Sequence, residues 1–188
     1  MRLQPVERPS TLMGKLAYAM CKRRLGKVIT PLKVVYARVP KSMKVGYAIS
    51  KFTEVGFMLH PELRLLIQAH VARLNDCAFC VDIGEAIAAR GGISIAIHGA
   101  LDDYRTSPEF TARERAALAY AEEATLNKRV SDETFAVLRE HFNDREIVEI
   151  TLLNAIENYY NLINLPLEIE SDGLCAIAAP HAKVAATH

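Results

Sequence analysis

Residues 61–92 read PELRLLIQAHVARLNDCAFCVDIGEAIAARGG, and this stretch predicts two consecutive helices. A proline suits the first helical turn, and apolar residues then recur every three or four positions up to Leu74, which indicates one buried face. The Asn-Asp pair that follows interrupts the pattern. A second helix begins at about Cys77 and is stopped by Arg90-Gly91-Gly92, because glycine tolerates the left-handed backbone conformation that follows many helices. We therefore expect two helices joined by a short turn.

The rest of the chain shows the same helical periodicity. No segment alternates apolar and polar residues as a half-buried strand would. Further helices are expected between Pro9 and Pro31, within residues 40–57, and at about residues 111–126, 131–142 and 145–163. The last three begin at capping residues, namely Thr111 with Glu114, Ser131, and Asn143 with Glu146. The sequence thus predicts an all-α fold.

The length and the proline distribution indicate one core domain with an appended arm. The chain has 188 residues, and a domain typically takes about 150. Four of the eight prolines lie in the first 40 residues, where they divide the chain into short segments. We expect an N-terminal helical arm at residues 1–57, a helical bundle at residues 58–170 and a small, alanine-rich tail at residues 171–188.

Composition and charge narrow the function classes. A formal net charge of +1 gives no basic footprint for nucleic acid. No stretch approaches the roughly 20 apolar residues of a membrane helix, and the first 25 residues lack the apolar region of a signal peptide. Four cysteines with one close pair do not form the disulfide framework of a small secreted domain. We expect a cytoplasmic protein that binds neither nucleic acid nor membranes.

The close pair, Cys77 and Cys80, is a C-x-x-C motif at the start of a predicted helix. Residues three apart on a helix face one side, so the two sulfur atoms can reach each other. The positive end of the helix favours a thiolate, which is the nucleophilic form of cysteine. Structural zinc is the first alternative, but the remaining cysteines, Cys21 and Cys175, are solitary and far apart, so we expect no metal. Two inert buried cysteines are the second alternative.

The segment 74–80, LNDCAFC, follows one helix and precedes another that ends in Gly91-Gly92-Ile93-Ser94. Together with the stretch 158–161, NYYN, it resembles the carboxymuconolactone decarboxylase family, in particular its alkylhydroperoxidase D (AhpD) branch. The resemblance covers about residues 60–170. It implies an all-α, AhpD-like helical bundle that assembles into dimers, trimers or hexamers.

The resemblance also implies a chemistry, which is an antioxidant thiol peroxidase or disulfide reductase. Cys80 would attack the hydroperoxide or disulfide substrate, and Cys77 would resolve the product into a disulfide that an external dithiol reduces. The redox-active pair would serve without any other cofactor. The decarboxylase branch generally lacks the pair, so decarboxylase or lyase chemistry is less supported.

Two positions depart from the family pattern. The proton-relay glutamate and histidine of the family would fall at Leu65 and Gly84. Neither residue has a side-chain group that can accept or donate a proton. Three residues on the preceding helix are candidate substitutes, namely Glu62, Gln68 and His70. The alternative for the first two is a solvated surface, and for His70 a hydrogen-bonded core position. If no substitute acts, the protein is a non-catalytic or redox-sensing member of the family.

Polar residues in the last long helix are candidates for a substrate pocket, namely Asn154, Asn158, Tyr159, Tyr160 and Asn161. Buried polar groups need partners, so hydrogen bonds between helices are the alternative. Exchange with the cysteine pair is one interpretation of Cys175, and a packed residue of the tail is the one we expect; the sequence predicts no role for Cys21. The amphipathic helices and the arm offer more apolar surface than one small bundle hides, so we expect a homo-oligomer.

Overall fold

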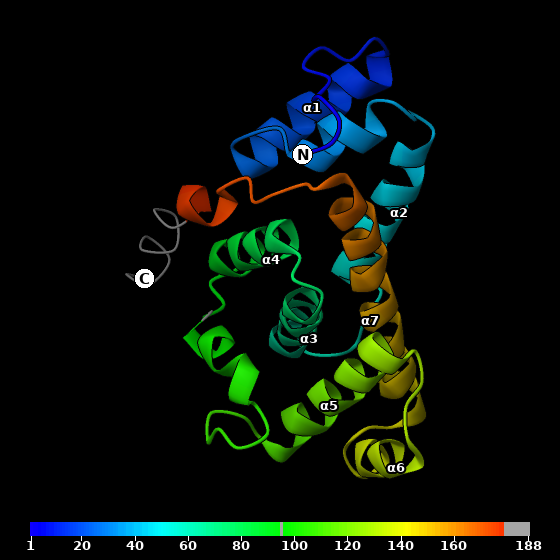
Figure 1. Cartoon of the computed structure of the whole chain (residues 1–188), viewed down its shortest axis with the longest axis vertical. Coiled ribbons are helices and arrows are strands. Elements are labelled where there is room, and N and C mark those ends of the chain that lie inside the picture. The colour runs from blue at the N-terminus through cyan, green and yellow to red at the C-terminus, as the bar shows by residue number, and fades with distance from the viewer. Residues whose placement is uncertain (95, 179–188) are drawn as a thin grey trace.

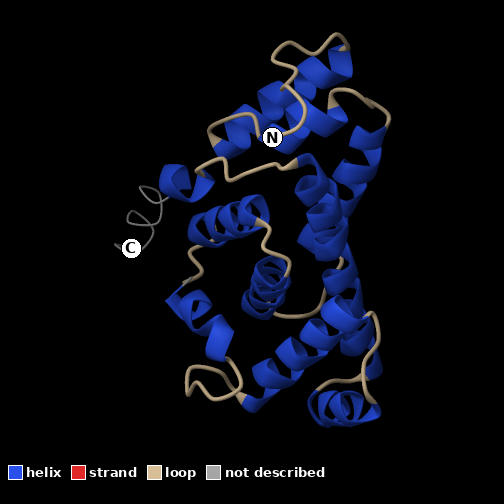
Figure 2. Cartoon of the chain, viewed as in Figure 1, coloured by secondary structure: helices blue, strands red, loops and turns tan. Residues whose placement is uncertain are grey.

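In a computed structural model, residues 1–94 and 96–178 are described, and this part of the chain contains helices and no strand (Figure 2). None of its helices is both long and apolar enough to cross a membrane. The elements are α1 (Leu12–Leu25), η1 (Leu32–Tyr36), α2 (Ser42–Val55), α3 (Pro61–Leu74), α4 (Ala78–Arg90), η2 (Ala96–Asp103), α5 (Ala112–Asn127), α6 (Asp132–His141), α7 (Asp144–Asn164) and η3 (Leu165–Leu167). The predicted all-α fold is confirmed.

Helix α3 lies at the centre of the bundle, where it contacts α4, α5 and α7 (Figure 1). Its apolar stripe explains this position, because Ile67 and Val71 are fully buried in one cluster with residues of α5 and α7. Fully burying an apolar side chain of this size stabilises the fold by roughly 1.5–3 kcal/mol. The central helix leads directly into the predicted dithiol.

Capping residues set the starts of the later helices, as the sequence predicts. Thr111 and Glu114 form a reciprocal capping box on α5, and Asn143 and Glu146 form another on α7. The Ser131 side chain accepts a hydrogen bond from the first turn of α6. These caps satisfy backbone N–H groups that have no partner within the helix.

Three short elements were not predicted from the sequence. The π-helical η1 follows Pro31, the 3₁₀ helix η2 occupies the segment between α4 and α5, and the 3₁₀ turn η3 follows α7. Elements of three to eight residues contain fewer than three turns, which is too short for a periodic apolar pattern to identify them.

The N-terminal arm packs on the bundle directly, through Val34 of η1, and also through the C-terminal strap, which we define as residues 168–178. The strap runs between α1 and α4 (Figure 1), and residues 174–178 form a helical turn. The Asp172 carboxylate accepts hydrogen bonds from the Thr30 amide at 2.6 Å and the Thr30 hydroxyl at 2.8 Å, and it pairs with Lys27 Nζ at 3.0 Å. The expected domain boundaries stay a prediction, and residues 179–188 of the expected tail lie outside the described residues.

Candidate functional site: a buried dithiol

The cysteine pair lies at the turn between α3 and α4. Helix α3 ends with Asp76 in the left-handed conformation (φ 53°), and two backbone hydrogen bonds close the turn, from Asp76 N to Arg73 O and from Cys77 N to Ala72 O, each 2.9 Å. This is the Schellman pattern of helix ends. The turn fixes the backbone of Cys77 as the residue that precedes α4.

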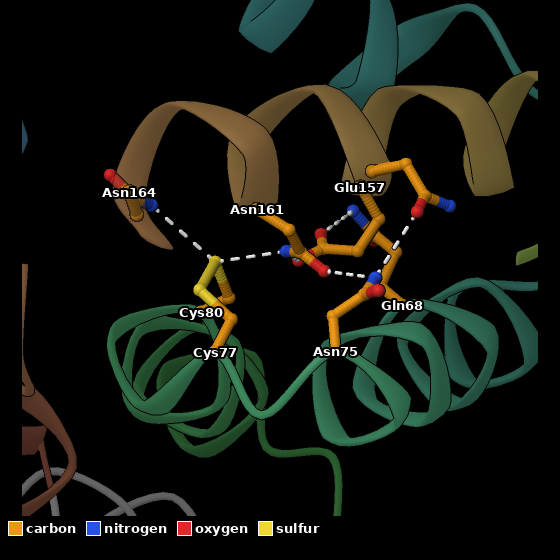
Figure 3. Close-up of a disulfide and its surroundings, with 8 residues drawn as sticks. Gln68, Asn75, Cys77, Cys80, Glu157, Asn161 and Asn164 are labelled. Atoms are coloured by element: carbon orange, nitrogen blue, oxygen red, sulfur yellow. Dashed lines mark hydrogen bonds between the residues drawn. A yellow bond between two sulfur atoms is a disulfide. The ribbon is translucent and has the colours of Figure 1, made fainter. Parts of the chain in front are cut away.

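Cys77 and Cys80 are joined by a disulfide, with their Cα atoms 5.3 Å apart (Figure 3). Cys77 is the N-cap of α4, and Cys80 lies in its first turn. The spacing therefore brings the two sulfur atoms together, as expected from one helical turn. The pair is buried, with 1% of Cys77 and 6% of Cys80 exposed.

The disulfide has an apolar wall and a polar wall. The apolar wall comes from η1, the end of α7 and the strap, and includes Val34, Ile169 and Leu174. The polar wall comes from α7, where Asn161 Nδ2 donates to Cys80 Sγ at 3.0 Å and Asn164 Nδ2 donates to it at 3.4 Å (Figure 3). Amide donors directed at a sulfur atom favour its thiolate over its thiol. Cys80 therefore has an environment suited to a nucleophile.

Asn75, next to the turn, orients the Asn161 amide. Asn75 Nδ2 donates to Asn161 Oδ1 at 2.7 Å, which leaves both hydrogens of Asn161 Nδ2 free to donate elsewhere. One goes to Cys80 and the other to Glu157 Oε1 at 2.8 Å. The side chains of two helices and one turn thus form a single hydrogen-bonded chain that ends at the sulfur.

Glu157 is the buried carboxylate of this chain, with 7% of the residue exposed. Its second oxygen accepts a long hydrogen bond of 3.5 Å from Gln68 Nε2 on α3. Burial raises the pKa of Glu157 to about 7, against the hydrogen bonds from Asn161 and Gln68, which lower it. A carboxyl group with such a pKa can gain or lose a proton at neutral pH.

The three relay substitutes predicted from the sequence lie in different places. Gln68 reaches the dithiol network through Glu157. Glu62 is exposed and pairs with His60 at 3.6 Å. His70 is buried with its Nε2 atom 3.8 Å from Glu122, and burial lowers its pKa to about 4 although the Glu122 charge opposes this. The structure thus brings Gln68, but neither of the other two, into the network around Cys80.

Asn154 and Asn158 serve contacts between helices. Asn154 Nδ2 donates to Ala121 O at 3.0 Å and to Thr125 Oγ1 at 2.7 Å, which ties α7 to α5. Asn158 also donates to Thr125, at 3.2 Å, and it accepts from Asn75 at 3.1 Å. Asn158 is therefore linked to the dithiol network as well.

The other predicted residues lie outside these hydrogen bonds. Tyr159 packs edge-on against Tyr160, with ring centroids 5.3 Å apart. Cys21 and Cys175 are free thiols of intermediate burial, and burial raises the pKa of each. Among the described residues, no group of three or more His, Cys, Asp and Glu side chains is placed to hold a metal ion.

Asp82 holds the strap over the dithiol. Its carboxylate accepts the backbone N–H groups of Asp172, Leu174 and Cys175 at 2.8–3.0 Å. These bonds lower the pKa of Asp82 although burial opposes them. Beside this contact lies a cleft of about 550 Å³, bordered by the first turns of α4, the end of α3 and the strap residue Ser171.

Glu157 and Asn164 were not predicted from the sequence, whereas Asn161 was one of the predicted pocket candidates. All three residues share one signal. They continue the buried stripe of α7 at helical spacing, after Ile150 and Leu153. Polar residues at positions where the pattern requires apolar ones indicate a buried network, because each needs a partner. The spacing E-x-x-x-N-x-x-N can therefore be recognised in the sequence, but its contact with Cys80 cannot.

Two bacterial proteins are similar to this chain in sequence. No protein-family model matches the chain. The uncharacterized protein YnjA of Escherichia coli is 32% identical over 185 residues, which are 94% of this chain and 97% of YnjA. The uncharacterized protein YdfG of Bacillus subtilis is 29% identical over 134 residues, 70% of this chain and 90% of YdfG.

Solved structures share the fold. ATU0492 of Agrobacterium tumefaciens, a protein of unknown function with a suggested place among AhpD antioxidant defence proteins, has a TM-score of 0.67 and 29% identity over 73% of this chain and 96% of its own. A peroxidase-related protein of Ralstonia eutropha JMP134 with an alkylhydroperoxidase AhpD core has a TM-score of 0.78 and 18% identity, with coverage of 94% and 95%. The debrominase Bmp8 has a TM-score of 0.79 and 19% identity, with coverage of 96% and 97%.

The chain is an all-helical protein with a cysteine pair at the start of an internal helix. Among such proteins, it belongs to the AhpD-like carboxymuconolactone decarboxylase family.

Proposed function

We propose that the protein is a thiol-dependent oxidoreductase of the alkylhydroperoxidase type, with Cys80 as the nucleophile and Cys77 as the resolving thiol. The observation that carries the proposal is the disulfide at the start of α4, in which Cys80 Sγ accepts hydrogen bonds from two α7 amides. Cys77 has no such donors among the described contacts, and it is the more buried of the two. The substrate is a hydroperoxide or a disulfide.

The reaction with a hydroperoxide takes three steps. The Cys80 thiolate attacks the terminal peroxide oxygen, the O–O bond breaks, and the leaving alkoxide gains a proton and departs as an alcohol. The Cys77 thiol then displaces water from the Cys80 sulfenic acid and forms the disulfide. An external dithiol reduces this bond and restores both thiols.

The polar wall suits the sulfenic acid as well as the thiolate. The Oδ1 atom of Asn164 is buried without a hydrogen-bond partner among the described residues. A buried acceptor of this kind is normally paired; because Asn164 Nδ2 donates to Cys80 Sγ, its Oδ1 faces away from the sulfur (Figure 3), and a sulfenic acid on Cys80 would accept from the Nδ2 atoms of Asn161 and Asn164. The neutral amides of α7 thus support the nucleophile in a chain that has Leu65 and Gly84 at the family's relay positions.

The test compares wild type with Cys77→Ser, Cys80→Ser and the matched control Cys175→Ser under peroxide and a dithiol reductant. Wild type and the control should consume peroxide repeatedly and form the intramolecular disulfide. Cys77→Ser should accumulate overoxidised Cys80, and Cys80→Ser should be inert. Unreactive Cys77 and Cys80 thiols in the native, reduced wild type would contradict the proposal.

A redox-sensing role is the second candidate, and the burial of both cysteines favours it. A sensor would be oxidised once per chain and would not cycle rapidly when peroxide and a dithiol are both supplied. The turnover number in the same assay separates the two functions. The compound 2,3,4-tribromopyrrole belongs in the substrate panel, because the debrominase Bmp8, which has this fold, has been solved in complex with it.

We further propose that the protein acts in the cytoplasm as a homo-oligomer. Leu12, Leu16 and Met20 are exposed on one face of α1, and Val45 and Tyr47 are exposed on α2. A second copy of the chain would cover such apolar surface. A sedimentation mass equal to one 20.9 kDa chain would contradict the assembly.

A further inference from the structure

One nitrogen atom, Asn161 Nδ2, donates hydrogen bonds to both Cys80 and Glu157. Asn161 Nδ2 donates one hydrogen to Cys80 Sγ at 3.0 Å and the other to Glu157 Oε1 at 2.8 Å (Figure 3). The sulfur and the carboxylate oxygen are therefore no further apart than the sum of these two distances. Both residues are more than nine-tenths buried. Two negative charges this close and this buried repel each other, so the reduced site favours one negative charge at a time.

The hydrogen bonds decide which group carries the charge. The sulfur accepts from Asn164 as well as from Asn161, whereas Glu157 has only the 3.5 Å contact with Gln68 in addition to Asn161. Each group accepts from two amides, but both contacts of the larger sulfur atom, 3.0 and 3.4 Å, are ordinary hydrogen bonds, whereas 3.5 Å is beyond the usual range for a carboxylate oxygen. Once the disulfide opens, these contacts favour the negative charge on Cys80 and the proton on the carboxyl group.

The surroundings of Glu157 supply no compensating positive charge through the contacts described. Its partners on α3 and α7, Gln68 and Asn161, are neutral amides. The ionisable groups that interact with it are the Cys80 thiol of α4 and Tyr160 of its own helix, whose pKa it raises. Tyr36 of η1 interacts with Tyr160 in turn, and burial raises its pKa too. These groups are neutral or anionic, so none of them stabilises a second negative charge.

We infer that Glu157 holds the second proton of the reduced site, so that Cys80 is a thiolate while the Glu157 carboxyl is protonated. The inference rests on the proposed function, since it requires a disulfide that opens and closes. Glu157 touches the reacting sulfur only through Asn161, and it acts as a positioning residue for the proton.

The atoms and charges balance over the cycle. The external dithiol delivers two electrons and two protons to the disulfide, and it leaves as a disulfide itself. One proton goes to Cys77 and the other to the Glu157 carboxylate, and Cys80 keeps the negative charge. When Cys80 attacks the hydroperoxide, the leaving alkoxide takes the proton of Glu157, and the carboxylate is restored. The site thus carries one negative charge before and after each half-reaction.

The test is the redox equilibrium of the full-length protein with reduced and oxidised dithiothreitol, measured between about pH 7.5 and pH 8.5, above the pKa of Glu157 and below the thiol pKa values of the reagent. In wild type the exchange releases no proton, so the ratio of reduced to oxidised protein should not change with pH. In Glu157→Gln the reduced protein releases one proton, so this ratio should rise about tenfold per pH unit. The matched control is Glu149→Gln, another buried carboxylate of α7, and it should behave as wild type.

The outcomes separate the two hypotheses. A pH-independent equilibrium in Glu157→Gln overturns the inference and leaves the proposed function intact. A wild-type disulfide that dithiothreitol cannot open contradicts the proposed function itself. A second measurement needs no variant: the infrared difference spectrum of wild type, reduced minus oxidised at about pH 8, should gain the carbonyl band of a protonated carboxyl group. Its absence also overturns the inference.

Discussion

The two halves of α7 each bury a carboxylate, and the two carboxylates behave in opposite ways. Glu149, in the N-terminal half, is 4% exposed, and Glu157, in the C-terminal half, is 7% exposed. Burial raises the pKa of both groups, yet the pKa of Glu149 ends below its ordinary value and that of Glu157 rises to about 7.

The difference lies in the hydrogen-bond donors. Glu149 accepts the backbone N–H groups of Met58 and Leu59 at 2.8 and 2.9 Å and the Arg145 guanidinium at 3.0 Å. Glu157 accepts from two side-chain amides, neither of them charged. A buried carboxylate with a cation and backbone donors stays ionised and serves the fold, because it holds the segment before α3 against α7. A buried carboxylate with neutral amides alone is available for a proton.

The largest expected effect on the peroxide rate comes from Asn161, whereas Asn154 of the same helix should affect only the stability of the fold. Asn161→Ala removes a donor from Cys80 and from Glu157, and should lower the rate with peroxide on the order of a hundredfold. Asn154→Ala removes only the contacts to α5, and should lower the free energy of unfolding by about 1–3 kcal/mol with the peroxide rate retained. Stopped-flow kinetics and urea unfolding measure the two effects. Equal rates for the two variants would show that the polar wall does not activate Cys80.

The second prediction concerns pH and the stability of the oxidised protein. The pKa of Glu157 is about 7 in the folded chain and 4.5 as its ordinary value. Folded protein therefore keeps a proton that unfolded protein releases, and stability should fall as pH rises from 4.5 to 7, by on the order of 3 kcal/mol. Glu149 acts in the opposite sense, since its lowered pKa gives stability that is lost as pH falls through the folded value.

Two variants separate these contributions in urea unfolding between about pH 4 and pH 8. Glu157→Gln should remove the loss of stability on the neutral side, and Glu149→Gln should remove part of the loss on the acid side. If Glu157→Gln keeps the wild-type slope between pH 4.5 and 7, the carboxyl group is not the one that titrates there.

The sequence predicted the helices that carry this site better than it predicted the hydrogen bonds around Cys80. Periodicity and capping residues located α3, α4 and α7, because those signals are local. The hydrogen bonds to Cys80 were not predicted, because their donors, Asn161 and Asn164, come from a helix about 80 residues further along the chain. Only packing brings the two helices together. Glu62 was considered because it is near the relay position in sequence, but the side of α3 that meets α7 carries Gln68 instead.

The smallest effects on the peroxide rate are expected from substitutions in α3, the helix that contacts Glu157 through Gln68. Gln68→Leu removes the long contact to Glu157, and should lower the peroxide rate only a few-fold, as for a weak hydrogen bond of about 0.5–1 kcal/mol. Glu62→Gln changes an exposed carboxylate, so the unfolding free energy should stay within about 0.5 kcal/mol of wild type and the peroxide rate should not change. The same kinetic assay compares the two variants. A larger loss in Glu62→Gln than in Gln68→Leu would mean that the proton reaches the site along the surface of α3 and not from Glu157.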